Sequence, residues 1–145
     1  MNMIVSIAII DPHYQFRKSL KAFLECDENL NVIHEVATEQ DLTEQIELLE
    51  LLPDIILLGT DDSLFDSWHA LQMIKESYPS TKVIAFSVFH DYYLSRIMVH
   101  AGVKGYLSKV TDAHIIREAI YTVNDGKYFI ETDAGKFEVF DTSPL

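Results

Sequence analysis

The feature that most constrains the fold is a short apolar run near the middle of the chain. Residues 55–58 read Ile-Ile-Leu-Leu, with Pro53 and Asp54 before them and Gly59 after them. A strand buried on both faces of a parallel sheet reads as such an unbroken run of branched apolar residues. We therefore expect a central strand that leaves the sheet at Gly59, at the edge where open α/β sheets hold their ligands and their chemistry.

Apolar runs and helical patterns alternate over most of the chain. The expected strands are residues 4–10, 30–36, 53–59, 82–87 and 105–108, and the helical patterns between and after them cover 12–26, 38–49, 64–78, 91–100 and 111–123. This alternation predicts an α/β fold with a doubly wound parallel sheet of five strands, covered by helices on both faces. Polar residues interrupt the second strand, which we therefore place at a sheet edge.

Local signals mark where several helices begin and end. Asp11 is expected to be the N-cap of the first helix, with Pro12 in its first turn. Thr38, with Asp41 three residues later, resembles a capping box. Gly102 is expected to end the fourth helix, and Thr111 or Asp112 to cap the fifth.

Length and composition exclude several classes of protein. The chain has 145 residues, 48% of them hydrophobic, which suits one ordered domain with a substantial core. The net charge of −12 repels phosphate backbones, so we expect no nucleic-acid binding through this domain. No apolar run is long enough for a membrane span and no signal peptide precedes the first strand, so we expect a soluble, cytoplasmic chain without membrane contacts.

The sulfur and imidazole groups indicate no metal centre. Cys26 is the only cysteine, which excludes an internal disulfide, and we expect it to be a buried or half-buried thiol. The histidines show no metal-ligand spacing and are expected to be scattered over the surface; they are His13, His34, His69, His90, His100 and His114.

Four of the five expected strands end in a set of residues that suggests a pocket. Asp11, Gly59, Ser87 and Lys109 stand at the carboxyl ends of the first, third, fourth and fifth strands. The carboxyl ends of parallel strands share one edge of the sheet, so an acid, a hydroxyl and an amine are expected to converge there.

Around these positions the sequence resembles the receiver domains of bacterial two-component response regulators, from about Ile4 to Ile130. The resemblance is carried by the segments A-I-I-D-P-H, L-P-D-I-I-L-L-G, K-V-I-A-F-S and H-A-G-V-K-G-Y-L-S-K. The last is typical of the subfamily with a LuxR/NarL-type helix-turn-helix. The resemblance implies the flavodoxin-like (βα)5 fold of CheY-like proteins, with strand order 2-1-3-4-5.

The resemblance also implies a role for each pocket residue. In the family, a histidine kinase transfers a phosphoryl group to an aspartate that ends the third strand, beside Mg²⁺ held partly by a pair of acids after the first strand. Asp11 matches the first of these acids, while Ser87 and Lys109 match the residues that grip the phosphoryl oxygens. Tyr106 matches an aromatic that swings inward on activation, although it could merely pack against the fourth helix.

Two positions depart from the family pattern. Pro12 stands in place of the second acid, and Gly59 stands in place of the phosphoacceptor aspartate. Because an acyl phosphate needs a carboxylate nucleophile and Mg²⁺ needs oxygen ligands, we expect an atypical receiver that is not an enzyme, has no catalytic residue and binds Mg²⁺ weakly or not at all. Lys109 is expected either to pair with Asp11 across Gly59 or to turn toward solvent or the acids at 61 and 62.

From Tyr128 onward the pattern of strands and helices fades into a tail, so we expect a receiver-like domain over residues 1–130 and a C-terminal tail or linker over 131–145. In the LuxR/NarL-type subfamily, a linker ending in Ser-Pro-Leu often runs straight into a helix-turn-helix, and residues 143–145 read Ser-Pro-Leu. The leading hypothesis is therefore a degenerate receiver that regulates transcription through an attached DNA-binding domain.

Two other hypotheses stay open at this point. The chain could be a stand-alone docking module that binds a protein partner irrespective of phosphorylation, or a conventional receiver that uses Asp61 or Asp62 as its acceptor. A sensor kinase and a second copy of the chain are the expected protein partners. The proposed dimer surface is apolar and consists of Phe89, Tyr92, Tyr93 and Ile97.

Overall fold

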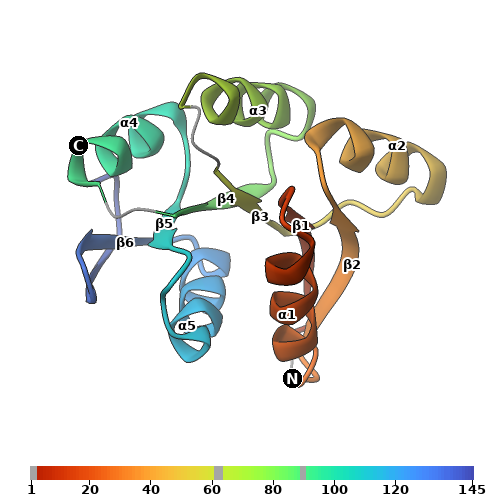
Figure 1. Ribbon diagram of the computed structural model, residues 1–145, viewed down its shortest axis with the longest axis horizontal. Helices are drawn as coiled ribbons and strands as arrows, with labels where there is room; N and C mark the ends of the chain where they lie inside the picture. The colour runs from red at the N-terminus through yellow and green to blue at the C-terminus, as the bar shows by residue number, and fades with distance from the viewer. Residues whose placement is uncertain (1–2, 61–63, 89–90) are drawn as a thin grey trace.

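The computed structural model describes residues 3–60, 64–88 and 91–145. The strands are β1 (Val5–Ile10), β2 (Leu30–Val36), β3 (Ile55–Gly59), β4 (Lys82–Ser87), β5 (Gly105–Ser108), β6 (Tyr128–Asp133) and β7 (Lys136–Phe140). The helices are α1 (Tyr14–Leu24), α2 (Glu39–Leu49), α3 (Leu64–Ser77), α4 (Tyr92–Ala101) and α5 (Ala113–Asn124) (Figure 1).

The strands form one sheet in the order β2-β1-β3-β4-β5-β6-β7. β1 to β6 all run parallel to one another, and β7 is antiparallel to β6. The predicted fold class and the order 2-1-3-4-5 are therefore confirmed, with β2 at one edge of the sheet.

Two hydrophobic cores lie on opposite faces of this sheet. Figure 1 shows α1 and α5 covering one face and α2, α3 and α4 covering the other. Ile7 and Ile9 of β1 point into the core under α1 and α5, whereas Ala8 and Ile10 point into the opposite core. Both faces of the central strands are thus dry, which explains why their sequences are unbroken apolar runs rather than alternating ones.

The expected helix caps agree with the structure at three of four positions. The Thr38 hydroxyl accepts a hydrogen bond from the Asp41 N–H at 3.1 Å, Asp112 caps α5, and Gly102 ends α4 with a φ of 118°. The prediction that Asp11 is the N-cap of the first helix is wrong. His13 occupies that position without a side-chain hydrogen bond, and α1 begins at Tyr14, which leaves the Asp11 carboxylate available for the pocket.

The largest departure from expectation is at the C-terminal end. The pattern after Tyr128 was expected to fade into an irregular tail, and this is wrong for most of that segment, because β6 and β7 form a hairpin that extends the sheet. β6 lies beside β5 (Figure 1) and adds Phe129 to one core and Ile130 to the other. Alternating apolar residues on either side of Ala134-Gly135, where Gly135 has a φ of 75°, are the hairpin signal that the sequence offered.

Two side chains lie in surroundings that differ from those expected. Cys26 is exposed, with its thiol donating to the carbonyl of Ala22 at 3.4 Å, so the buried-thiol prediction is wrong. His34 is buried in β2, and its Nε2 lies 2.7 Å from the carbonyl oxygen of Leu51. It is therefore not one of the surface histidines: one ring nitrogen meets the chain that leads into β3, while Nδ1 is buried without a hydrogen-bond partner among the described residues.

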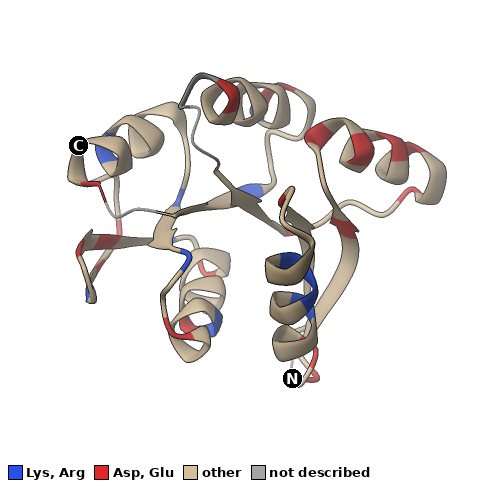
Figure 2. Ribbon diagram, in the orientation of Figure 1, with Lys and Arg blue, Asp and Glu red and all other residues tan. Residues whose placement is uncertain are grey.

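Charge is distributed unevenly over the helices. Figure 2 shows basic residues on α1, where Arg17, Lys18 and Lys21 lie, and acidic residues along α2. Within the described ranges, no helix combines the length and the apolar character needed to cross a membrane.

Candidate functional site

The pocket at the carboxyl edge of the sheet forms from the ends of β1, β3, β4 and β5. Gly59 pairs with Phe86 next to the end of β4, and Ser87 pairs with Ser108 at the end of β5. The Lys109 N–H donates to the carbonyl of Ser87 at 2.7 Å, which fixes the backbone where the lysine leaves the sheet.

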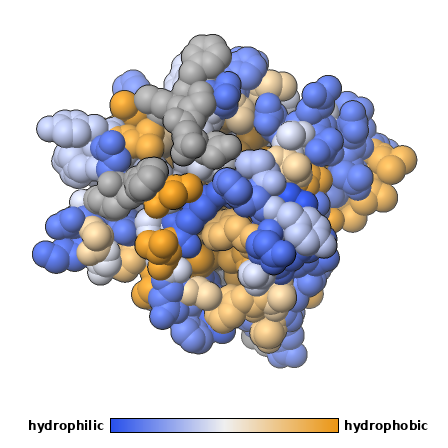
Figure 3. Space-filling model, in the orientation of Figure 1, coloured by the Kyte–Doolittle hydropathy of each residue, from blue (hydrophilic) through white to orange (hydrophobic). Residues whose placement is uncertain are grey.

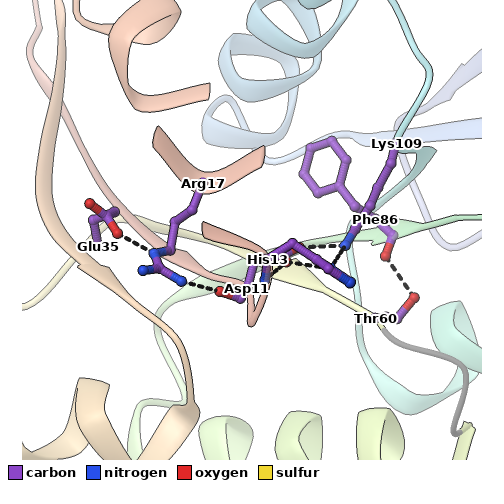
Figure 4. Close-up of polar contacts among 7 residues, drawn as sticks. All are labelled: Asp11, His13, Arg17, Glu35, Thr60, Phe86 and Lys109. Carbon is purple, nitrogen blue, oxygen red and sulfur yellow. Dashed lines mark hydrogen bonds and ion pairs between the residues drawn. The ribbon is translucent and has the colours of Figure 1, made fainter. Parts of the chain in front are cut away.

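Asp11 and Lys109 form an ion pair at the centre of this pocket. Lys109 Nζ lies 2.6 Å from Asp11 Oδ2, and the exposed fractions of the two side chains are 10% and 0% (Figure 4). Such a buried pair tolerates the loss of neither partner, because the remaining charge would be stranded away from water. Of the two alternatives expected for Lys109, the pairing with Asp11 across Gly59 is confirmed.

The absence of a side chain at Gly59 is what makes room for this pair. A Cβ built on Gly59 would lie 1.8 Å from Asp11 Oδ2 and 2.5 Å from Asp11 Cγ, far inside van der Waals contact. The Asp11 carboxylate thus occupies the space in which any side chain at residue 59 would begin.

His13 completes the pocket; its side chain is exposed, as expected, but its contacts with Asp11 and Lys109 were not predicted. The His13 N–H donates to Asp11 Oδ1 at 2.8 Å, and His13 Nδ1 lies 3.1 Å from the same oxygen and 3.2 Å from Lys109 Nζ (Figure 4). The spacing D-P-H was the available signal, because a residue two positions after a strand-end acid can fold back over its carboxylate.

The first turn of α1 anchors Asp11 from the other side. Arg17 NH1 donates to the carbonyl oxygen of Asp11 at 2.7 Å, and Arg17 Nε bonds to the Glu35 carboxylate (Figure 4). Burial raises the pKa of Glu35, but hydrogen bonds from Lys18 and Arg17 outweigh it, so the pKa lies below its ordinary value. Arg17 thereby links β2 to Asp11 and fixes the backbone from which the Asp11 carboxylate enters the pocket.

An apolar groove continues from the pocket between α1 and α5. Lys109 Nζ lies 4.9 Å from the centre of the Phe16 ring. The groove next to Lys109 has a volume of about 160 Å³ and is lined by Phe16, Phe23 and Ile116 among others. A larger cavity, of about 270 Å³, lies elsewhere, beside α4. Figure 3 shows apolar side chains gathered in the middle of the molecular surface seen in that view. The groove is too small to hold more than a few atoms of a ligand.

Tyr106 and Ser87 lie side by side beneath the pocket rather than at its surface. Tyr106 is fully buried in the core that also contains Met98 of α4. Burial raises the pKa of Tyr106 and the nearby Ser87 hydroxyl acts in the opposite direction, while the Tyr106 hydroxyl has no hydrogen-bond partner among the described residues. Within the described part of the chain, no hydrogen bond joins the Ser87 hydroxyl to Lys109.

The described pocket residues do not form a magnesium site. Asp11 is the only carboxylate among Asp11, Pro12, Gly59, Ser87 and Lys109, and both of its oxygens are already engaged, one by Lys109 and one by His13. Mg²⁺ requires near-octahedral oxygen ligands, whereas an ammonium group occupies the position beside the carboxylate. The acids at 61 and 62, which the sequence analysis weighed as alternative partners, lie outside the described residues.

Comparison with known proteins identifies the family. The protein-family profile for the response regulator receiver domain matches residues 7–121. This chain belongs to the response regulator receiver family. The receiver is 31% identical to the transcriptional regulatory protein DegU of Brevibacillus brevis over 127 residues, which cover 87% of this chain and 52% of DegU. It is also 31% identical to the transcriptional regulatory protein LiaR of Bacillus subtilis over 134 residues, or 91% of this chain and 62% of LiaR.

Solved structures share the fold of this receiver. The signal receiver domain of NarL from Mycobacterium tuberculosis superimposes with a TM-score of 0.74 at 22% identity, over 86% of this chain and 98% of that one. A structure of two RcsB dimers bound to two parallel DNAs superimposes with a TM-score of 0.78 at 18% identity, over 88% of this chain and 64% of that one. The receiver spans between 52% and 62% of the length of its first curated relatives.

The expected dimer surface is only partly described. Tyr92, Tyr93 and Ile97 are exposed on α4, as the surface requires, with 76% of Tyr93 accessible. Phe89 lies outside the described residues. Dimer formation itself remains a prediction.

Proposed function

We propose that this chain is an atypical receiver that signals without phosphorylation at the usual position. It acts in transcription regulation through an attached DNA-binding domain. It serves as a protein-binding module rather than as an enzyme. Its partners are proteins: a second copy of the chain and a signalling protein such as a sensor kinase.

The observation that carries this proposal is the position of the Asp11 carboxylate. In the family that this chain belongs to, the acceptor side chain starts at residue 59 and the lysine meets the phosphoryl group. Here Asp11 Oδ2 lies 1.8 Å from where the first atom of that side chain would be and 2.6 Å from Lys109 Nζ. An internal carboxylate therefore takes the place of the phosphoryl group as the partner of the lysine, which favours one state over a phosphorylation cycle.

The orientation of Tyr106 supports the same conclusion. In the family, the aromatic of the fifth strand swings inward when the hydroxyl of the fourth strand moves on activation. Tyr106 is fully buried in the core that also contains Met98 of α4. A receiver with this side chain already inward is expected to present its active surface constitutively.

The proposed link to transcription rests on the relatives. DegU and LiaR are named transcriptional regulatory proteins, and this chain covers 52% and 62% of their lengths. A net charge of −12 opposes direct contact with DNA. DNA binding is thus assigned to a separate domain following Leu145, and the test is whether the reading frame continues into a helix-turn-helix.

Incubation with acetyl phosphate and Mg²⁺ tests the phosphorylation part of the proposal. We expect no phosphoryl adduct by intact-protein mass spectrometry, because residue 59 offers no nucleophile and Asp11 is engaged on both oxygens. The matched variant carries Pro12→Asp and Gly59→Asp, which supplies both missing acids, and it should gain a hydroxylamine-labile adduct. An adduct of that kind on the unmodified chain, at Asp11, Asp61 or Asp62, would refute the proposal.

A further inference from the structure

Glu131 is a buried acid in the unexpected strand β6. Glu131 is 2% exposed. Its Oε1 accepts hydrogen bonds from the Ser108 N–H at 3.0 Å and from the Thr111 hydroxyl at 2.9 Å. Its Oε2 faces the Gly135 N–H in the hairpin turn at 3.4 Å. A buried carboxylate is costly unless hydrogen bonds compensate for its lost hydration, so these contacts must form together.

The hydrogen bonds to Glu131 bracket the pocket lysine. Ser108 immediately precedes Lys109, and Thr111 follows it by two positions in the connection between β5 and α5. The Thr111 N–H also donates to the Ser108 carbonyl at 3.1 Å, which closes a tight turn around Lys109. One side chain of the hairpin thus fixes both ends of the segment that carries the lysine.

Beyond the Lys109 N–H bond to the Ser87 carbonyl, the side of this segment that faces the hairpin has little packing. Val110, beside the lysine, is 87% exposed. A cavity of about 420 Å³ separates the segment from the hairpin turn, with Val110 and Phe137 among its lining residues. Packing is therefore thin on the side of the loop that faces the hairpin, and directed hydrogen bonds must hold it.

We propose that Glu131 is a positioning residue for Lys109. By holding the connection between β5 and α5, it keeps the ammonium group against Asp11. The position of the hairpin is thereby coupled to the Asp11–Lys109 pair. Displacement of the hairpin releases the lysine, and breaking the Asp11–Lys109 pair loosens the hairpin, because such coupling is reciprocal. This inference goes beyond the proposed function and stands whether or not the pocket accepts a phosphoryl group.

The accessibility of the Lys109 amine tests the proposal. Trace acetylation with acetic anhydride, read out by peptide mass spectrometry, measures how often the ion pair opens, and Lys21 on α1 serves as the internal reference. Glu131→Ala should raise Lys109 labelling at least about tenfold, the effect of losing one hydrogen bond to a charged acceptor. Glu131→Gln retains an oxygen for both donors and should stay within about threefold of the unmodified chain.

A destabilised variant elsewhere separates positioning from general loosening. Val32→Ala, in β2 at the opposite edge of the sheet, lowers global stability without touching the loop and should leave Lys109 labelling unchanged relative to Lys21. Thr111→Val removes one of the two close hydrogen bonds to Glu131 Oε1, together with the 3.3 Å contact between the Thr111 and Ser108 hydroxyls, and should give an intermediate increase, which carries the test if Glu131→Ala does not fold. Unchanged labelling in both loop variants, or an equal increase in Val32→Ala, would overturn the proposal.

Discussion

Asp11 shows how one missing side chain can change the role of a neighbour. With no Cβ at Gly59, the Asp11 carboxylate lies in the centre of the pocket, fully buried and paired with Lys109. His13 and Arg17 then hold the carboxylate and the backbone of the same residue. At this scale the positive charge of Lys109 is balanced by a carboxylate from within the same pocket.

The strength of the Asp11–Lys109 pair can be measured by a double-mutant cycle. Lys109→Met should lower the free energy of unfolding by about 3 kcal/mol, because it strands a buried carboxylate. Adding Asp11→Asn removes that charge as well, so the double variant should recover about 2 kcal/mol relative to the sum of the single changes. Urea unfolding at neutral pH measures both quantities.

The matched control for this cycle is Lys127→Met. Lys127 lies 3.8 Å from Asp141, and the two side chains are 50% and 84% exposed, so the loss should stay below about 0.5 kcal/mol. Equal effects of the two lysine substitutions would show that the buried pair contributes no more than a surface contact.

A second polar contact, between Tyr121 and Asp27, makes stability depend on pH. The Tyr121 hydroxyl donates to Asp27 Oδ2 at 2.6 Å and connects α5 to the turn after α1. This bond, followed by the Asn29 N–H, lowers the pKa of Asp27, whereas burial and then the bond to Asp27 raise the pKa of Tyr121 to about 12. The contact is therefore complete only when the acid is ionised and the phenol is neutral.

Tyr121→Phe should destabilise the fold by about 1 kcal/mol at neutral pH. The folded-state pKa of Asp27 is depressed, so this difference is fully present above about pH 4, the unfolded value, and is lost progressively as pH falls below it through the lower folded-state pKa. The pKa of Tyr121 is raised, so the difference begins to decline above about pH 10. Urea unfolding over this range, with Tyr14→Phe on the exposed side of α1 as control, measures it; a difference that does not vary with pH would contradict the assignment.

At the scale of elements, the β6–β7 hairpin covers the edge strand β5 and forms a new sheet edge that carries charged side chains. β6 covers β5 and lies between α4 and α5, where it supplies apolar side chains to both cores. The new outer strand, β7, exposes Lys136 and Glu138. Charges on an edge strand discourage pairing with further strands, so the hairpin closes the sheet at that end.

Truncation tests whether the hairpin is part of the fold. A chain ending at Lys127 should lose at least about 3 kcal/mol of stability, since it removes Phe129 and Ile130, which are 3% and 5% exposed. A chain ending at Phe140 lacks only exposed residues and should stay within about 1 kcal/mol of the full chain. Similar urea midpoints for the two truncations would mean that the hairpin is only an appendage.

At the scale of the whole molecule, α4 presents the apolar surface proposed for a dimer. Tyr92, Tyr93 and Ile97 are exposed by 48%, 76% and 44% on this one helix. Exposed apolar groups gathered in this way mark interaction surfaces in soluble proteins. Since β6 covers the edge of β5, pairing must use the outer face of α4 rather than that strand.

We expect a homodimer without phosphate, measurable as twice the chain mass by light scattering at high micromolar concentration. Tyr93→Arg combined with Ile97→Arg should shift it to the monomer, because the variant places like charges across a two-fold interface. Tyr14→Arg, which changes an exposed tyrosine on α1, is the matched control. A monomeric unmodified chain at that concentration would contradict the prediction.

Most of the architecture was predictable from local sequence patterns. The unbroken runs in β1, β3 and β4, and the signals at Thr38, Asp112 and Gly102, depend on residues close together in the chain, so their meaning survives without knowledge of the rest. The convergence of Asp11, Gly59 and Lys109 also followed, because parallel strands place their carboxyl ends at one edge. Those features the amino-acid sequence determined by itself.

The remaining features were decided by contacts between distant segments. Whether Asp11 caps a helix or pairs with Lys109 depends on the space above Gly59, which no local pattern describes. The burial of His34 depends on the Leu51 carbonyl beside it, and that of Glu131 on the turn around Lys109. Polar side chains are buried only where partners from elsewhere in the chain replace their hydration, and only the tertiary structure brings those partners together.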